Sequence, residues 1–183
     1  MSGESWQRFL EAWRERCGLR PLDHPIFSGV GRVWRVEMHP AFHDDVAVTV
    51  TEMSSGGFIE LRALGREAHA WATLDAGGVA HPTAPAPAPR VWEAPVTTEQ
   101  VEALAARMPR LPLHSLPVGI DGMIVLHEAL LDGAPLRFWS WSPTLARAPL
   151  HREYVVALCE LAAGALRDPA AQAALHPLAA YLR

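Results

Sequence analysis

The sequence predicts an α+β fold in which an antiparallel sheet is covered by helices. Apolar residues recur with a period of two from Gly29 to Leu74 and again on both sides of Asp132-Gly133. They recur with a helical period at both ends of the chain and after Thr97. The resulting order of helix, strands, helix, hairpin and helices does not alternate as a βαβ fold would. There is no repeat of about 20–50 residues that would indicate a solenoid.

The chain begins with a predicted amphipathic helix over residues 5–17. Its apolar positions share one face, with Glu and Arg between them, and they are Trp6, Phe9, Leu10, Trp13 and Cys17. Gly18 follows at the place where a helix commonly ends.

Residues 29–74 predict a meander of about four antiparallel strands. Three alternating apolar sets lie on successive strands: Trp34, Val36 and Met38, then Val46, Val48 and Val50, then Ile59 and Leu61. The cluster Ser54-Ser55-Gly56-Gly57 and the later Gly65 fall where turns are needed.

A Pro/Ala-rich segment, residues 80–95, follows the meander. Its prolines at positions 82, 85, 87, 89 and 95 favour extended polyproline geometry over helix or sheet. The segment can cross one domain or tether two, since ten extended residues reach roughly 30 Å. We therefore expect a single domain over 1–183, or two half-domains, 1–79 and 96–183.

The C-terminal half predicts a helix, a hairpin and two further helices. Thr97 and Gln100 have the spacing of a capping box, and Pro109 ends the helix that they begin. Asp132-Gly133 is a two-residue turn signal between apolar strands over 123–131 and 131–141. A helix over 150–167 follows, and Asp168-Pro169 then starts a last helix that is broken near His176-Pro177.

Composition narrows the classes of partner. Half of the 183 residues are hydrophobic and 20% are charged, which is typical of a folded globular chain. All 16 basic residues are arginine, a pattern typical of a GC-rich coding sequence, such as a bacterial one. The net charge of -4 argues against a nucleic-acid partner, because such domains usually carry a net basic face.

The cysteine count and the ends of the chain indicate a cytoplasmic protein without a membrane anchor. Only Cys17 and Cys159 are present, one on each of two predicted helices, so no disulfide framework is expected. The first twenty residues lack the apolar core of a signal peptide, and the longest apolar stretch, 154–166, is too short to span a bilayer.

The densest polar cluster surrounds Pro40 and contains Glu37, His39, His43, Asp44 and Asp45. Imidazole and carboxylate groups are zinc ligands, and a turn could bring His39, His43 and Asp45 onto one ion. On a connection between strands, however, the four-residue spacing offers no helical face where the two imidazoles could converge. The pattern favours a solvated turn, and the three residues form the alternative hypothesis of a metal site.

No catalytic motif is recognised, and we expect neither a catalytic residue nor a cofactor. His127 and Glu128 are neighbours on one strand, so their side chains point to opposite faces and cannot act as a pair. No nucleophile elbow and no glycine-rich phosphate loop occurs. Cys159 is typical of a small core residue, and Cys17, close to Arg14 and Arg16, is expected to be the more reactive thiol.

Aromatic residues alternate along the strand that ends in Trp139-Ser140-Trp141. Arg137, Trp139 and Trp141 share one face of this strand, and Phe138 points the other way. An exposed stripe of this kind is typical of a protein-binding surface. The favoured alternative is that a helix covers the stripe, with Arg137 lying over an indole.

The C-terminal third, from Asp121-Gly122 through Asp132-Gly133 to the Trp-Ser-Pro triplet and the following helix, resembles small bacterial α+β proteins. This group includes immunity-type partners of contact-dependent toxins, and the resemblance covers residues 120–167. It implies a role in binding another protein and says nothing about chemistry.

Two functional hypotheses follow. The first is a non-enzymatic protein-interaction or regulatory domain that uses Arg137, Trp139 and Trp141 and binds another protein or a second copy of itself. The alternative is a small enzyme, or a small-molecule or metal binder, with a pocket between sheet and helices. Its polar groups would be His39, His43 and Asp45, or His127.

Overall fold

The computed structural model describes residues 3–65, 72–74, 80–82, 88–108 and 122–183. The described helices are α1 (Gly3–Cys17), η1 (Pro25–Phe27), α2 (Thr98–Ala105), α3 (Pro149–Ala165), α4 (Pro169–Leu175) and η4 (His176–Leu182). The strands are β1 (Val33–Pro40), β2 (Asp45–Met53), β3 (Gly56–Leu64), β4 (Ala72–Leu74), β5 (Ala80–Pro82), β6 (Arg90–Val96), β7 (Met123–Leu131) and β8 (Ala134–Trp141). Among these residues, no helix is both long enough and apolar enough to span a membrane.

An open six-stranded antiparallel sheet confirms the predicted α+β fold. Its strand order is β6-β3-β2-β1-β7-β8, and β4 and β5 form a separate two-stranded sheet. The hairpin of β7 and β8 joins the meander because β7 pairs with β1. Strands from both sides of the Pro/Ala-rich segment therefore belong to one sheet.

The fourth strand of the meander lies where the sequence predicted polyproline geometry. The strand next to β3 is β6 (Arg90–Val96), and all of it except Val96 belongs to the segment 80–95. The expectation of polyproline geometry instead of a sheet was wrong for residues 90–95, and also for β5, which pairs with β4. Residues 83–87 of that segment lie outside the described residues.

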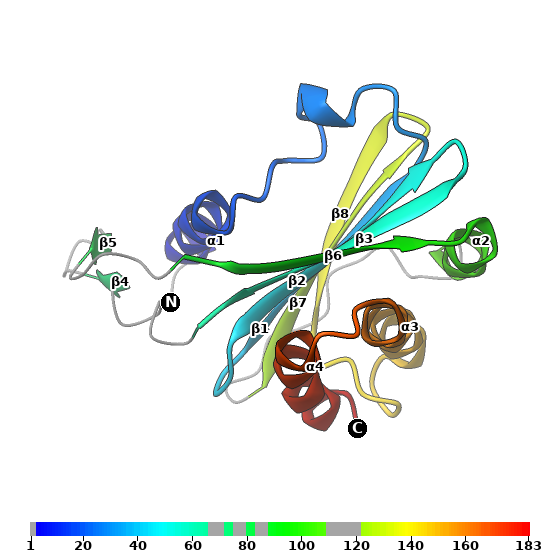
Figure 1. Ribbon diagram of the computed structural model, residues 1–183. Helices are drawn as coiled ribbons and strands as arrows, with labels where there is room; N and C mark the ends of the chain where they lie inside the picture. The colour runs from blue at the N-terminus through cyan, green and yellow to red at the C-terminus, as the bar shows by residue number, and fades with distance from the viewer. Residues whose placement is uncertain (1–2, 66–71, 75–79, 83–87, 109–121) are drawn as a thin grey trace.

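Helices cover the two faces of the sheet unequally. α2, α3, α4 and η4 pack on the face that carries Trp34, Val48 and Leu61, and together they form the main hydrophobic core (Figure 1). α1 lies on the opposite face, where Trp13 and Cys17 pack against Ala47 and Leu64 (Figure 1). The main core thus lies beneath these four helices, whereas the α1 face has a smaller apolar cluster.

Local signals in the sequence account for several of these elements. Thr97 and Gln100 form the predicted capping box of α2, with the Thr97 side chain accepting from the Gln100 N–H at 3.2 Å. Asp132 and Gly133 have φ angles of 50° and 76°, as a type I′ turn requires. Asp168 caps α4, and the predicted break near His176 is the change from α-helix to 3-10 helix.

Candidate functional site

The outer edge of β8 presents the backbone groups of the residues that form the aromatic stripe. The type I′ turn makes Leu131 and Ala134 a hydrogen-bonded pair, and such pairs recur at every second residue. The N–H of Ser142 donates to the Met123 carbonyl at 2.7 Å, which continues the same alternation. The backbone groups that point away from β7 therefore belong to Pro135, Arg137, Trp139 and Trp141.

The stripe is exposed at one end and covered at the other. The Arg137 side chain is 52% exposed, Trp139 is half-buried, and Trp141 is only 9% exposed. Instead of lying over an indole, the Arg137 guanidinium donates from Nε to a Glu128 carboxylate oxygen at 2.6 Å. Among the described residues, no strand pairs with the outer edge of β8. Arg137 and Trp139 are thus the accessible part of the predicted stripe.

Glu128 links the stripe to charged residues beneath α1. It lies opposite Arg137 on β8 and Arg35 on β1, and only 3% of its side chain is exposed. It accepts from Arg14 Nη2 at 2.8 Å and from Arg35 Nη1 at 3.2 Å. The guanidinium groups of Arg14, Arg35 and Arg137 thus surround one buried carboxylate. Glu128 holds the Arg137 side chain against the sheet.

The predicted solvated turn is present at Ala41, Phe42 and His43, which are exposed, but the prediction was wrong for His39. His39 belongs to β1 and is buried, because Trp13 of α1 packs on its ring with a centroid distance of 4.6 Å. Its Nδ1 lies 3.4 Å from Asp45 and its Nε2 lies 3.9 Å from Glu37. Burial alone would lower the pKa of His39, but the carboxylates of Asp45 and Glu37 raise it to about 9. His39 is therefore a buried cation at neutral pH.

The predicted metal ligands do not converge. His43 lies on the connection from β1 to β2, and its Nδ1 is 2.9 Å from the Tyr181 hydroxyl on η4. Asp45 and Glu37 approach opposite nitrogens of the His39 ring, so they cannot share an ion with it. In the part of the chain that the structure describes, no three His, Cys, Asp or Glu side chains are arranged to hold a metal.

His127 and Glu128 point to opposite faces of the sheet, as predicted. His127 lies in the core, stacked on Phe138 at 4.6 Å and paired through Nε2 with the Ser140 hydroxyl at 2.9 Å. Burial, together with the neighbouring His151, lowers the pKa of His127 to about 3. His127 is therefore a neutral structural group in the core.

The two cysteine thiols are protonated at neutral pH. Burial, with the charges of Asp45 and Glu37, raises the pKa of Cys17 to about 12. Burial and Glu160 raise the pKa of Cys159 to about 12 as well. The expectation that Cys17 is a more reactive thiol was wrong, because the end of α1 buries it against the sheet.

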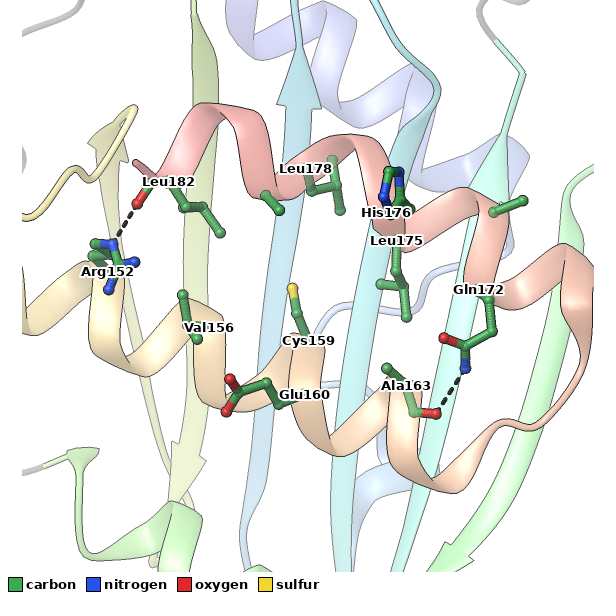
Figure 2. A pocket seen from close by; sticks show the side chains of 12 residues that line it. Arg152, Val156, Cys159, Glu160, Ala163, Gln172, Leu175, His176, Leu178 and Leu182 are labelled. Carbon is green, nitrogen blue, oxygen red and sulfur yellow. Dashed lines mark hydrogen bonds between the residues drawn. The ribbon is translucent and has the colours of Figure 1, made fainter.

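A groove of about 620 Å³ separates α3 from α4 and η4 (Figure 2). Figure 2 shows Cys159 on its floor, with Val156 on one wall and Leu178 on the other. At one end Arg152 donates to the Leu182 carbonyl, and at the other Gln172 donates to the Ala163 carbonyl at 2.7 Å. The two polar side chains that mark its ends are engaged by the protein itself. His39 and His127, which the sequence offered as polar groups of a pocket, do not line this groove.

The ion pairs that Arg14 and Arg35 form beneath α1 were not predicted from the sequence. Arg35 and Glu37 alternate with the apolar side of β1, which is the usual pattern of a solvated sheet face. The position of Arg14 could have indicated these pairs. It lies on the same side of α1 as Trp13 and Cys17, so packing of those two residues places its guanidinium against the sheet.

Comparisons with protein-family models, with curated proteins and with solved structures gave no match.

Proposed function

We propose that this chain is a non-enzymatic protein-interaction domain that binds an extended segment of its partner along the outer edge of β8. One observation carries the proposal. The same two residues, Arg137 and Trp139, have backbone N–H and C=O groups that point away from β7 and side chains that form the accessible part of the stripe. Strand addition takes affinity from main-chain hydrogen bonds and specificity from alternate side chains.

The opposite edge of the sheet, formed by β6, is less suited to strand addition than the β8 edge. The same alternation makes Val91, Glu93 and Pro95 the outward-facing residues of β6. A proline without an N–H and an exposed acidic side chain are devices that protect a sheet edge from pairing. On β8 the only outward proline is Pro135, near the start of the strand. The outward backbone N–H groups of Arg137, Trp139 and Trp141 can all donate hydrogen bonds.

The partner class that we favour is a protein whose activity this domain regulates. The resemblance of residues 120–167 to immunity-type proteins supports it, because that segment contains β7, β8 and α3. Trp and Arg are enriched among residues that dominate binding energy, which also favours a protein partner.

Two proline variants at opposite edges test the proposal. Trp139→Pro removes an outward N–H from β8, and Glu93→Pro removes one from β6, while neither position donates to a neighbouring strand. We expect a partner from the native host to be retained by wild type and Glu93→Pro and lost by Trp139→Pro. In the wild-type complex, deuterium exchange should slow at residues 137–141.

Trp139→Ala separates the contribution of the side chain from that of the backbone. It keeps the N–H, so we expect binding weaker than wild type but stronger than that of Trp139→Pro. Full retention of the partner by Trp139→Pro, or protection confined to another surface, would contradict strand addition at β8.

The groove between α3 and α4 supports a second candidate, the binding of a small apolar molecule. Its volume falls within the range of about 300–1,000 Å³ that is usual for ligand pockets. Ala163→Trp would fill the groove from α3, and Glu153→Trp, on the exposed side of the same helix, is the matched control. If a metabolite raises the melting temperature of the wild type and the control but not of Ala163→Trp, the groove is its site.

A further inference from the structure

We propose that the β8 edge also pairs with β8 of a second copy of this chain, giving a two-fold dimer with one continuous sheet. This inference rests on the proposed function, because it uses the same outward backbone groups of Arg137, Trp139 and Trp141. It adds a second occupant of the same edge, another copy of this chain, and the register of that pairing.

The sequence of β8 is self-complementary in one antiparallel register. When Trp139 lies opposite Trp139 of the second copy, Arg137 lies opposite Trp141 of that copy. All three outward residues of each strand then form hydrogen-bonded pairs, with about six hydrogen bonds across the two-fold axis. The register thus uses every outward donor that β8 offers after Pro135.

Charge and proline placement disfavour the neighbouring registers. A shift that places Arg137 opposite its own copy brings two guanidinium groups together, and like charges directly opposite are destabilising. A smaller shift in the same sense, with Arg137 opposite Trp139, places Pro135 against Trp141 and leaves the Trp141 carbonyl without a donor. The Trp139 register instead gives each cation an indole as its cross-strand neighbour, and cations and indoles attract.

In the part of the chain that the structure describes, no strand pairs with this end of the sheet. α1 packs over β2 and β3, where its apolar residues meet Ala47 and Leu64, and α2 packs on β3. On the other face, the first turn of α3 reaches β8, since the His151 and Phe138 rings are 5.6 Å apart. Leu150 beside it and the preceding Leu145 are 37% and 66% exposed, so a second copy at this edge would find apolar neighbours.

Light scattering at increasing protein concentration tests whether the dimer forms. We expect the wild type and a Glu93→Lys control, changed at the opposite edge, to reach the mass of a dimer. Trp139→Lys places two cations face to face at the axis and should stay monomeric at the same concentrations. Trp139→Pro provides a second variant in case Trp139→Lys does not fold, which circular dichroism would reveal.

Cross-linking tests the register. In a Cys159→Ser background, a short thiol cross-linker should join two copies of Trp139→Cys. It should not join two copies of Arg137→Cys, whose positions would lie about 13 Å apart along the strands. Equal cross-linking of both variants, or of Arg137→Cys alone, would overturn the register.

The two proposals fail in different ways. A wild type that remains monomeric at all concentrations and gives no Trp139→Cys cross-link overturns self-pairing. If Trp139→Pro still abolishes capture of a host partner, the proposed function stands without the dimer. If both fail, the β8 edge is not a binding site.

Discussion

His39 is held as a cation by two carboxylates beneath the first helix. Together with Arg14 and Arg35 it opposes Glu37, Asp45 and Glu128, so that three positive and three negative groups lie between α1 and the sheet. Removing charges from water is costly unless each one is paired, and here each one has a partner of opposite sign. We therefore expect the stability of the fold to depend on the protonation of His39.

The stability of the protein should fall as pH rises through the pKa of His39. The folded pKa is about 9 and the ordinary value is 6.5, so the folded state binds more protons between these two pH values. The contribution of His39 is fully present below about pH 6.5 and is lost as pH approaches 9. Urea unfolding of wild type and His39→Gln across this range measures it. If the free energy of unfolding of the wild type falls with pH no more steeply than that of His39→Gln, the charged state of His39 is contradicted.

Glu128 should be the carboxylate whose loss costs most. Its replacement by alanine leaves Arg14 and Arg35 beneath α1 without their shared acceptor, and removing one partner of a buried pair costs about 3–5 kcal/mol. Glu102→Ala is the matched control, since Glu102 also pairs with an arginine but its side chain is 58% exposed. The control should cost less than about 1 kcal/mol. Equal costs in chemical denaturation would show that burial of Glu128 is unimportant.

At the scale of elements, local signals made the helices and the β7–β8 turn predictable, whereas the role of β6 was not. The capping box at Thr97 and the Asp132-Gly133 turn act within a few residues. β6 was missed because prolines dominated its surroundings, yet Pro95 faces outward from an edge strand, where a missing N–H costs nothing. Such a position depends on which strand becomes the edge, and that is a tertiary property.

The candidate site, too, could be predicted from the sequence only in part. Alternation along β8 predicted which residues share a face, but not that β8 would be an edge strand or that Arg137 would bind Glu128. His39 was misassigned because its burial comes from Trp13, more than twenty residues away along the chain. Contacts between elements of this kind have no signature in a local window.

Arg14 should control how firmly α1 is attached to the sheet. Its guanidinium reaches Glu37 at 2.9 Å and Glu128 at 2.8 Å, and Cys17 lies buried one turn further along the helix. In Arg14→Ala we expect local opening of α1 and faster labelling of Cys17 by a maleimide, measured in a Cys159→Ser background. Glu15→Ala, on the exposed side of α1, should label at the wild-type rate. Unchanged labelling in Arg14→Ala would mean that apolar contacts alone hold the helix.

At the scale of the whole molecule, the six-stranded sheet crosses the Pro/Ala-rich segment. β1 pairs with β7 along eight residue pairs, from Val33 with Leu130 to Pro40 with Met123. The main core likewise combines Val36 and Val48 from one side of the segment with Val125 and Leu158 from the other. A half consisting of residues 1–79 alone would expose the apolar face of three strands that α3 otherwise covers.

The chain should therefore unfold in a single cooperative transition and not as two half-domains. Since neither half retains its core without the other, tryptophan fluorescence, far-UV circular dichroism and calorimetry should report the same midpoint. A break of the chain within 83–87 should leave the two pieces associated, because β6 still pairs with β3 and β7 with β1. The separately expressed pieces 1–79 and 96–183 should each lack a cooperative transition. A cooperative melt of either piece alone would establish two independent domains and would place the β7–β8 hairpin, with its binding edge, in a unit of its own.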